Sequence, residues 1–282
     1  MNDIAGRFAT DPTALEGSDG NSSLPEHMRD SRGLRFAIAA TLLFLVIATL
    51  ESWLLEWLAP GISVLSSGLL SGVTLSAVAI SGLSHFRLWE QLGFRRPGRW
   101  RDLVLFAPFV LVGLAPLSAG VQAAPGTVVA WGVAALLIAF YKMVLLAGLL
   151  YAFKSRGRWQ AVALAALVFA LFELGGVLAG GVLATTSLLS VMYFFLAFAY
   201  GAAWLRTGTT WPLVIANALM TVSAAATQRS EASNLASSVP EMLSGIVVAI
   251  LLATYGAFLM RKRGRSADRR QTAADDLVKA TL

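Results

Sequence analysis

The chain has 282 residues, of which 57% are hydrophobic and 13% charged; its mean hydropathy is +0.69 and its net charge is +6. A soluble domain has about 45 to 50% apolar and about 25% charged residues, so the composition excludes an ordinary soluble protein. It predicts an all-α protein, a polytopic transmembrane helical bundle. The lack of cysteine excludes disulfides, thiol catalysis and Cys-ligated metals.

Residues 1–34 are rich in Asp, Ser and Gly and lack a sustained apolar run. We expect a disordered cytoplasmic tail here, and no signal peptide, because the first apolar segment begins too late and is too long for one. Residues 35–260 form the predicted transmembrane helical domain, and residues 261–282 form a basic cytoplasmic tail.

Pro and Gly clusters and charged flanks divide the apolar sequence into about eight spans. The predicted spans are 36–58, 62–84, 103–120, 126–153, 159–180, 184–205, 209–227 and 241–260. With the N-terminus inside, all of the 22 Lys and Arg residues except Lys142 and Arg229 lie on the inner side. Because cytoplasmic loops carry the Lys and Arg excess, this predicts a multi-pass protein of a bacterial-type inner (plasma) membrane with both termini cytoplasmic. The positive charge then indicates attraction to anionic lipid and needs no nucleic acid as partner.

The loop 86–100, with sequence "FRLWEQLGFRRPGRW", alternates Arg with Phe and Trp. This pattern is typical of a connector in the headgroup region, where rings lie in the interface and guanidinium groups reach water. A gate or a partner-docking surface is the alternative interpretation.

Two ionisable residues fall inside apolar spans, Lys142 in the fourth and Glu173 in the fifth. Each lies about 12 to 15 residues from a cytoplasmic helix end, so antiparallel neighbouring helices would bring both to a similar depth. Pairing is the usual way in which charges are accommodated in a membrane, and we expect a buried ion pair. Asn217 and Thr221, four residues apart, share a helix face and predict polar contacts between helices, as do Ser187 and Ser190.

The region 142–221 resembles the core of the CPBP family, the CAAX-protease, bacteriocin-processing and Abi-like intramembrane proteases. Those proteins carry Glu-Glu-x-x-x-Arg followed by Gly on one helix, Phe-x-x-x-His on the next, and His-x-x-x-Asn or Asp on a later helix after "TGxxWP". Here "LLAGLLYAFKSRGRWQAVALAALVFALFEL" has the expected Gly, basic turn and apolar helix, and "WLRTGTTWPLVIANALM" has the expected lead-in. "LGFRRP" is similar to the family as well. The resemblance implies a CPBP/CAAX-protease-like core over about 126–227.

The catalytic positions of the family are substituted in this chain. Alignment on Gly148 puts Lys142 and Met143 at the glutamate pair and Ala147 at the arginine, and a shift of one residue would put Tyr141 and Lys142 at the pair. Phe169 keeps the aromatic residue, Glu173 replaces its His, Asn217 replaces the second His, and Thr221 replaces the final Asn or Asp. The resemblance therefore implies that Lys142 and Glu173 face each other, because the residues they replace face one cavity.

The only histidines are His27 and His85, and both lie outside the predicted spans. No His or Cys metal site can form in the bundle, and Glu173 with Asn217 and Thr221 would be an oxygen-only set suited to Mg²⁺ or Ca²⁺. We therefore predict no metal, no cofactor and no zinc-type activation of water.

Three functions fit these features. The first is a non-catalytic relative (a pseudoprotease) that binds a membrane peptide or protein partner within the lipid bilayer. The second is an atypical intramembrane peptidase, with Glu173 as base or Lys142 as base to a nearby Ser. The third is a small-solute or proton transporter. The non-catalytic relative predicts an intact cavity with no polar groups beyond the pair. The peptidase predicts a Ser hydroxyl within hydrogen-bonding reach of Lys142. The transporter predicts helices that are interrupted near the midplane of the membrane.

Overall fold

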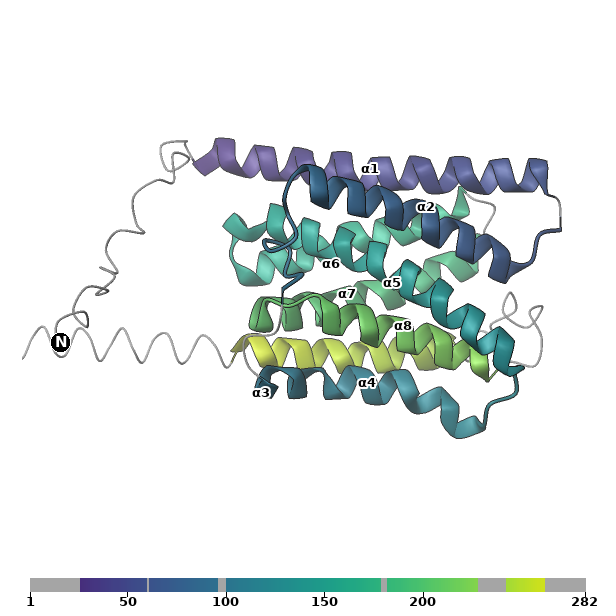
Figure 1. Ribbon diagram of the computed structural model, residues 1–282. Helices are drawn as coiled ribbons and strands as arrows, with labels where there is room; N and C mark the ends of the chain where they lie inside the picture. The colour runs from purple at the N-terminus through teal and green to yellow at the C-terminus, as the bar shows by residue number, and fades with distance from the viewer. Residues whose placement is uncertain (1–25, 60, 96–99, 179–181, 228–241, 262–282) are drawn as a thin grey trace, which may run out of the picture.

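The computed structural model describes residues 26–59, 61–95, 100–178, 182–227 and 242–261, and every regular element in them is a helix (Figure 1). The α-helices are α1 (Glu26–Leu58), α2 (Val64–His85), α3 (Trp100–Leu103), α4 (Ala107–Leu114), α5 (Pro125–Ala152), α6 (Arg158–Leu174), α7 (Leu183–Thr207), α8 (Trp211–Ala226) and a C-terminal helix (Met242–Arg261). Short 3-10 turns cover Val104–Phe106, Ala115–Ala119, Lys154–Arg156 and Gly175–Val177.

Six of these helices are long and apolar enough to cross a membrane, so the chain is a multi-pass membrane protein. They are Ile38–Leu58, Val64–His85, Pro125–Ala152, Arg158–Val177, Leu183–Thr207 and Met242–Arg261. The predicted spans 103–120 and 209–227 correspond to two shorter apolar helices, Val104–Ala119 and Trp211–Ala226. Proline explains the irregularity of the first, because Pro108 and Pro116 each stand at the start of a new helical segment.

α1 begins at Glu26, inside the segment that the sequence analysis assigned to a disordered tail of residues 1–34. A helix that has already formed adds further residues at little cost, so the polar residues 26–34 extend the apolar span. The other parts of the two predicted tails, residues 1–25 and 262–282, lie outside the described residues.

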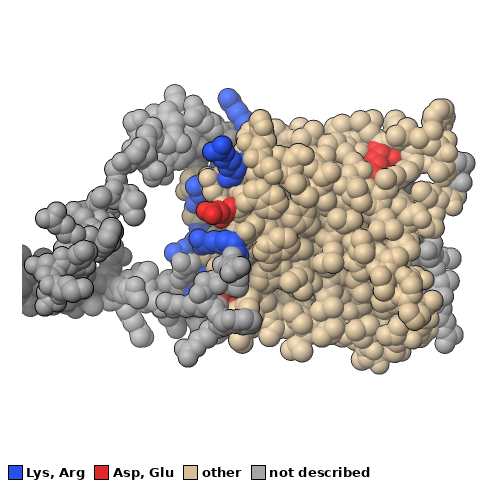
Figure 2. All heavy atoms as spheres, in the orientation of Figure 1, with Lys and Arg blue, Asp and Glu red and all other residues tan. Residues whose placement is uncertain are grey.

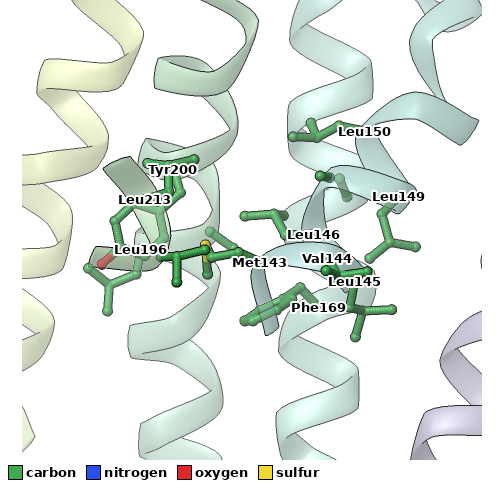
Figure 3. Packing of buried hydrophobic residues seen from close by; sticks show 14 of the residues in the cluster. Met143, Val144, Leu145, Leu146, Leu149, Leu150, Phe169, Leu196, Tyr200 and Leu213 are labelled. Atoms are coloured by element: carbon green, nitrogen blue, oxygen red, sulfur yellow. The ribbon is translucent and has the colours of Figure 1, made fainter. Parts of the chain in front are cut away.

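α5 forms the centre of the bundle. Its residues 139–147 are buried without a break, which is the pattern of a helix surrounded by others. Figure 3 shows Met143 and Leu146 of α5 within the cluster that also contains Phe169 of α6 and Tyr200 of α7. α5 contacts α2, α8, α1, α6 and α7.

α1 lies along one edge of the bundle beside α2 (Figure 1). Among the described side chains of α1, Phe44 alone is buried, whereas large apolar residues such as Leu42, Leu50 and Trp57 are exposed. Exposed apolar residues in such numbers would aggregate in water, and they indicate that this helix faces lipid.

The charged side chains gather at one end of the bundle. Figure 2 shows Lys and Arg at the end where α1 begins and the C-terminal helix finishes. An acidic patch farther along the bundle lies over α1, which carries Glu51 and Glu56. We call the Lys- and Arg-rich end the basic end.

Candidate functional site: a buried ion pair

The two intramembrane charges that the sequence analysis expected to pair lie against each other. Nζ of Lys142 on α5 is 2.7 Å from Oε1 of Glu173 on α6, and the two side chains are only 11% and 14% exposed. Oε1 is buried and, among the described residues, has no partner besides this ammonium. In such surroundings water does not screen the attraction, and each charge offsets much of the cost of burying the other.

A third helix, α7, completes the site. Nζ of Lys142 lies 4.4 Å from the ring centroid of Tyr193, a distance at which an aromatic face attracts a cation. Ser190 Oγ donates a hydrogen bond of 2.6 Å to the carbonyl of Ala170. Residues three apart lie on the same face of a helix, so Ser190 and Tyr193 share one face of α7. Ala170 and Glu173 share one face of α6 in the same way. The hydrogen bond between Ser190 and Ala170 therefore holds these two faces together beside the acid.

The other positions that the resemblance aligned with the family's catalytic residues are closely packed. Met143, Ala147 and Phe169 are each 2% exposed and belong to the hydrophobic core. The Phe169 ring contacts the rings of Phe172 and Tyr193 at centroid distances of 6.5 and 6.2 Å. These three residues belong to the hydrophobic core and add no polar group to the site.

Asn217 and Thr221 on α8 are not joined to the pair by any hydrogen bond or ion pair in the described part of the chain. Thr221 Oγ1 donates to the carbonyl of Asn217 at 3.2 Å, so the hydroxyl is satisfied within its own helix. The contact between helices that we expected for Ser190 is confirmed, whereas the one expected for Thr221 stays a prediction. The described residues also bring no group of three His, Asp or Glu side chains close enough to hold a metal ion.

Glu51 of α1 is a partly buried acid that the sequence analysis did not single out. Both of its carboxylate oxygens are inaccessible, and the side chains of Ser71 and Thr74 on α2 lie close enough to interact with them. Tyr141 of α5 lies within electrostatic range of Glu51 and of the ion pair. The available signal was the position of Glu51, in the middle of the apolar run "LFLVIATLESWLL".

Two loops that carry parts of the family resemblance meet at the basic end. Thr210, in "TGTTWP", donates its backbone N–H to the carbonyl of Gly93, in "LGFRRP", at 2.9 Å. Thr210 Oγ1 and Trp204 Nε1 both donate to the carbonyl of Leu92, the latter at 3.1 Å. Gly93 has a φ of 82°, and a Cβ there would lie 2.7 Å from the Gly208 carbonyl oxygen, so only glycine fits.

The fold and the site together define a multi-pass helical membrane protein with an ion pair buried between three of its helices. No protein-family model, no curated protein and no solved structure matches the chain.

Proposed function

We propose that the chain is a non-catalytic relative of the CPBP (CAAX-type) intramembrane proteases that binds a membrane peptide or protein partner without cleaving it. The proposal is carried by the 2.7 Å contact between Lys142 and Glu173. These residues stand where the resemblance puts a glutamate of the catalytic pair and a histidine. An ammonium held by a carboxylate leaves neither group free to activate water, which needs a base or a metal of suitable properties.

Two further features support this proposal. The first is the hydrogen bond between Gly93 and Thr210, which joins the segment "LGFRRP" to the segment "TGTTWP". The second is that Met143, Ala147 and Phe169 belong to the hydrophobic core and supply no polar group. A cavity around the motif positions was expected of such a relative, but the cavity described below is lined neither by Lys142 nor by Glu173. We therefore infer that the partner binds to helix surfaces or loops.

The proposed topology has eight crossings in a bacterial-type inner membrane, with both termini cytoplasmic. α8 begins beside the Gly93 loop at the basic end, and the Ala226 carbonyl at its other end accepts hydrogen bonds from the backbone of Gln122 and Ala123. The short helix therefore extends between loops at opposite ends of the bundle. Residues 104–119 run in the same direction as α8, because Gln122 and Ala123, which follow them, meet the end of α8.

The proposal is tested with the purified full chain, a farnesylated C-terminal peptide and a leader-bearing peptide. Mass spectrometry follows cleavage, and fluorescence anisotropy follows binding. We expect one of the two peptides to bind and both to stay intact, with or without a chelator. Cleavage by the pure protein, or failure of both peptides to bind, would contradict the proposal; the inactive Lys142→Met, Glu173→Met double variant identifies contaminating peptidase.

The buried carboxylate of Glu51 favours a second candidate, a small-solute or proton pathway, because acidic residues inside membranes often mark such routes. Proton flux into proteoliposomes, abolished by Glu51→Gln and kept in the matched exposed variant Glu56→Gln, would favour it over the first. The atypical peptidase, in the form with Lys142 as base, required a Ser near that lysine. In the described residues, the contacts of Nζ are with Glu173 and Tyr193, and no hydrogen bond joins it to a serine.

A further inference from the structure

A cavity of about 320 Å³ lies between the first half of α1, the second half of α2 and the second half of α5. Its wall is formed by selected residues of the segments 39–44, 78–83, 86–92 and 144–149, among them Phe44, Leu83 and Leu149, and each residue that lines it is apolar. Small residues create the space: a Cβ built on Gly82 meets no atom within 4 Å. The volume is at the lower end of the range of about 300 to 1,000 Å³ that is usual for ligand sites.

The cavity reaches from the lipid-facing surface to the core. Leu43 and Phe86 in its wall are 52% and 62% exposed, whereas Leu83 and Leu149 are 2% and 1% exposed. The exposed side of α1 is apolar and faces hydrocarbon. A hydrocarbon chain can therefore enter from the bilayer without passing through water.

A cation stands beside the opening. Arg87 is exposed, and its neighbours Phe86 and Leu88 both belong to the wall. The Leu88 N–H donates to the Leu83 carbonyl at 2.9 Å and the Arg87 N–H to the Ser84 carbonyl at 3.3 Å, which is the Schellman arrangement at a helix end. Arg87, with a φ of 53°, occupies the position of that motif at which glycine is usual.

We propose that the cavity binds one acyl chain of an anionic phospholipid, with the lipid phosphate beside Arg87. The apolar wall offers no hydrogen-bond partner to a peptide backbone, whereas a hydrocarbon chain needs none. The opening lies at the basic end, where Lys and Arg attract anionic headgroups (Figure 2). The site is separate from the proposed function, since Lys142 and Glu173 do not line it.

The test uses the delipidated full chain in detergent, with dioleoyl phosphatidylglycerol and dioleoyl phosphatidylcholine as probes and native mass spectrometry as the readout. The wild type retains phosphatidylglycerol in preference to phosphatidylcholine. Gly82→Leu fills the space and lowers retention of both lipids. The matched control is Gly132→Leu on α5, where a built Cβ also meets no atom within 4 Å and which lies outside the wall; it retains lipid as the wild type does.

Arg87→Gly separates a binding role from a structural one. Glycine suits the left-handed backbone, so the melting temperature is maintained, while the preference for phosphatidylglycerol falls about fivefold, the effect of one basic residue near a charged membrane surface. This variant keeps the test decisive if Gly82→Leu fails to fold. Equal retention of the two lipids by the wild type, an unchanged preference in Arg87→Gly, or retention of a farnesylated peptide instead of either lipid would overturn the proposal.

Discussion

A lysine in hydrocarbon costs about 2.5 to 3.5 kcal/mol even by insertion measurements, and the surroundings of Lys142 lower that cost in two ways. The carboxylate of Glu173 lies 2.7 Å away, and the face of Tyr193 lies 4.4 Å from the same ammonium. Neither charge would be tolerated as well alone. The two charges therefore compensate each other physically.

Removing one partner of the pair is expected to destabilise the protein more than removing both. Lys142→Met or Glu173→Met leaves an uncompensated buried charge, at a typical cost of about 3 to 5 kcal/mol, whereas the double variant has neither charge. The measurement is thermal unfolding in detergent, with Leu146→Met as a volume-conserving control that costs less than about 1.5 kcal/mol. Single effects that simply add in the double variant would show that the two charges do not stabilise each other.

Helix depth made the pair predictable, because two charges at equal distances from the same membrane face have few other partners. Tyr193 was not predictable in the same way. An aromatic residue in the apolar run "SVMYFFLAF" gives no signal of which neighbour it faces, since the rotation of α7 is set by packing. Glu51 shows the converse case: its position in the span was visible, but its burial depends on how α1 packs against α2.

Gly93→Ala is expected to lower stability by more than about 1 kcal/mol. The left-handed backbone disfavours any side chain, and the new Cβ would collide with the Gly208 carbonyl and break the contact between the two loops. Gly132→Ala is the matched control, because it meets no atom and should stabilise its helix by up to about 1 kcal/mol. A melting temperature of Gly93→Ala equal to that of wild type would mean that the loops need not join.

At the scale of whole helices, packing distance decides which small residues are required. The C-terminal helix contacts α7 closely at Gly256, where a built Cβ lies 3.0 Å from Ala202 Cβ and 3.1 Å from Ala199 Cα. Near the start of the same helix, Gly245 faces only the flexible Met192 side chain, at 3.0 Å from its sulfur. Small residues permit such close approach of backbones in membranes.

We therefore expect Gly256→Ala to lower the melting temperature and Gly245→Ala to leave it unchanged or raise it. The backbone at Ala199 cannot move aside, whereas Met192 can adopt another rotamer, and each substitution improves helix propensity equally. Both variants are compared by thermal unfolding in the same detergent. Equal decreases of the melting temperature in the two variants would show that the distance between the helices does not determine the effect of the substitutions.

The sequence located every one of the helices that cross the bundle, because long apolar runs bounded by charge, Pro or Gly are strong signals. It was less accurate at their ends. α1 extends to Glu26 because helix propagation costs little even in polar sequence, and Val104–Ala119 contains irregular turns that Pro108 and Pro116 impose. The cavity beside α1 had no counterpart in the sequence, since it depends on where small residues of three helices come together.

At the scale of the whole molecule, the two short helices determine the orientation of everything that follows them. Each has 16 residues, or about 24 Å, against a hydrocarbon core of about 30 Å. A shorter span is accommodated by local thinning of the bilayer at modest cost. If Val104–Ala119 did not cross the membrane while every other helix did, the loop 154–158 would lie on the outer side. Its Lys and Arg residues would then be outside, against the usual distribution of charge.

If both short helices cross, reporters fused after residues 60, 122, 182 and 232 all report the outer face, while reporters after 95, 156 and 207 report the cytoplasm. The expectation rests on the positions of the short helices, which connect loops at opposite ends of the bundle, and on the gathering of Lys and Arg at one end. Alkaline phosphatase and green fluorescent protein fusions at each site supply opposite readouts and control for expression. A cytoplasmic signal after residue 122 would remove the crossing by Val104–Ala119, and one after residue 232 would remove the crossing by Trp211–Ala226.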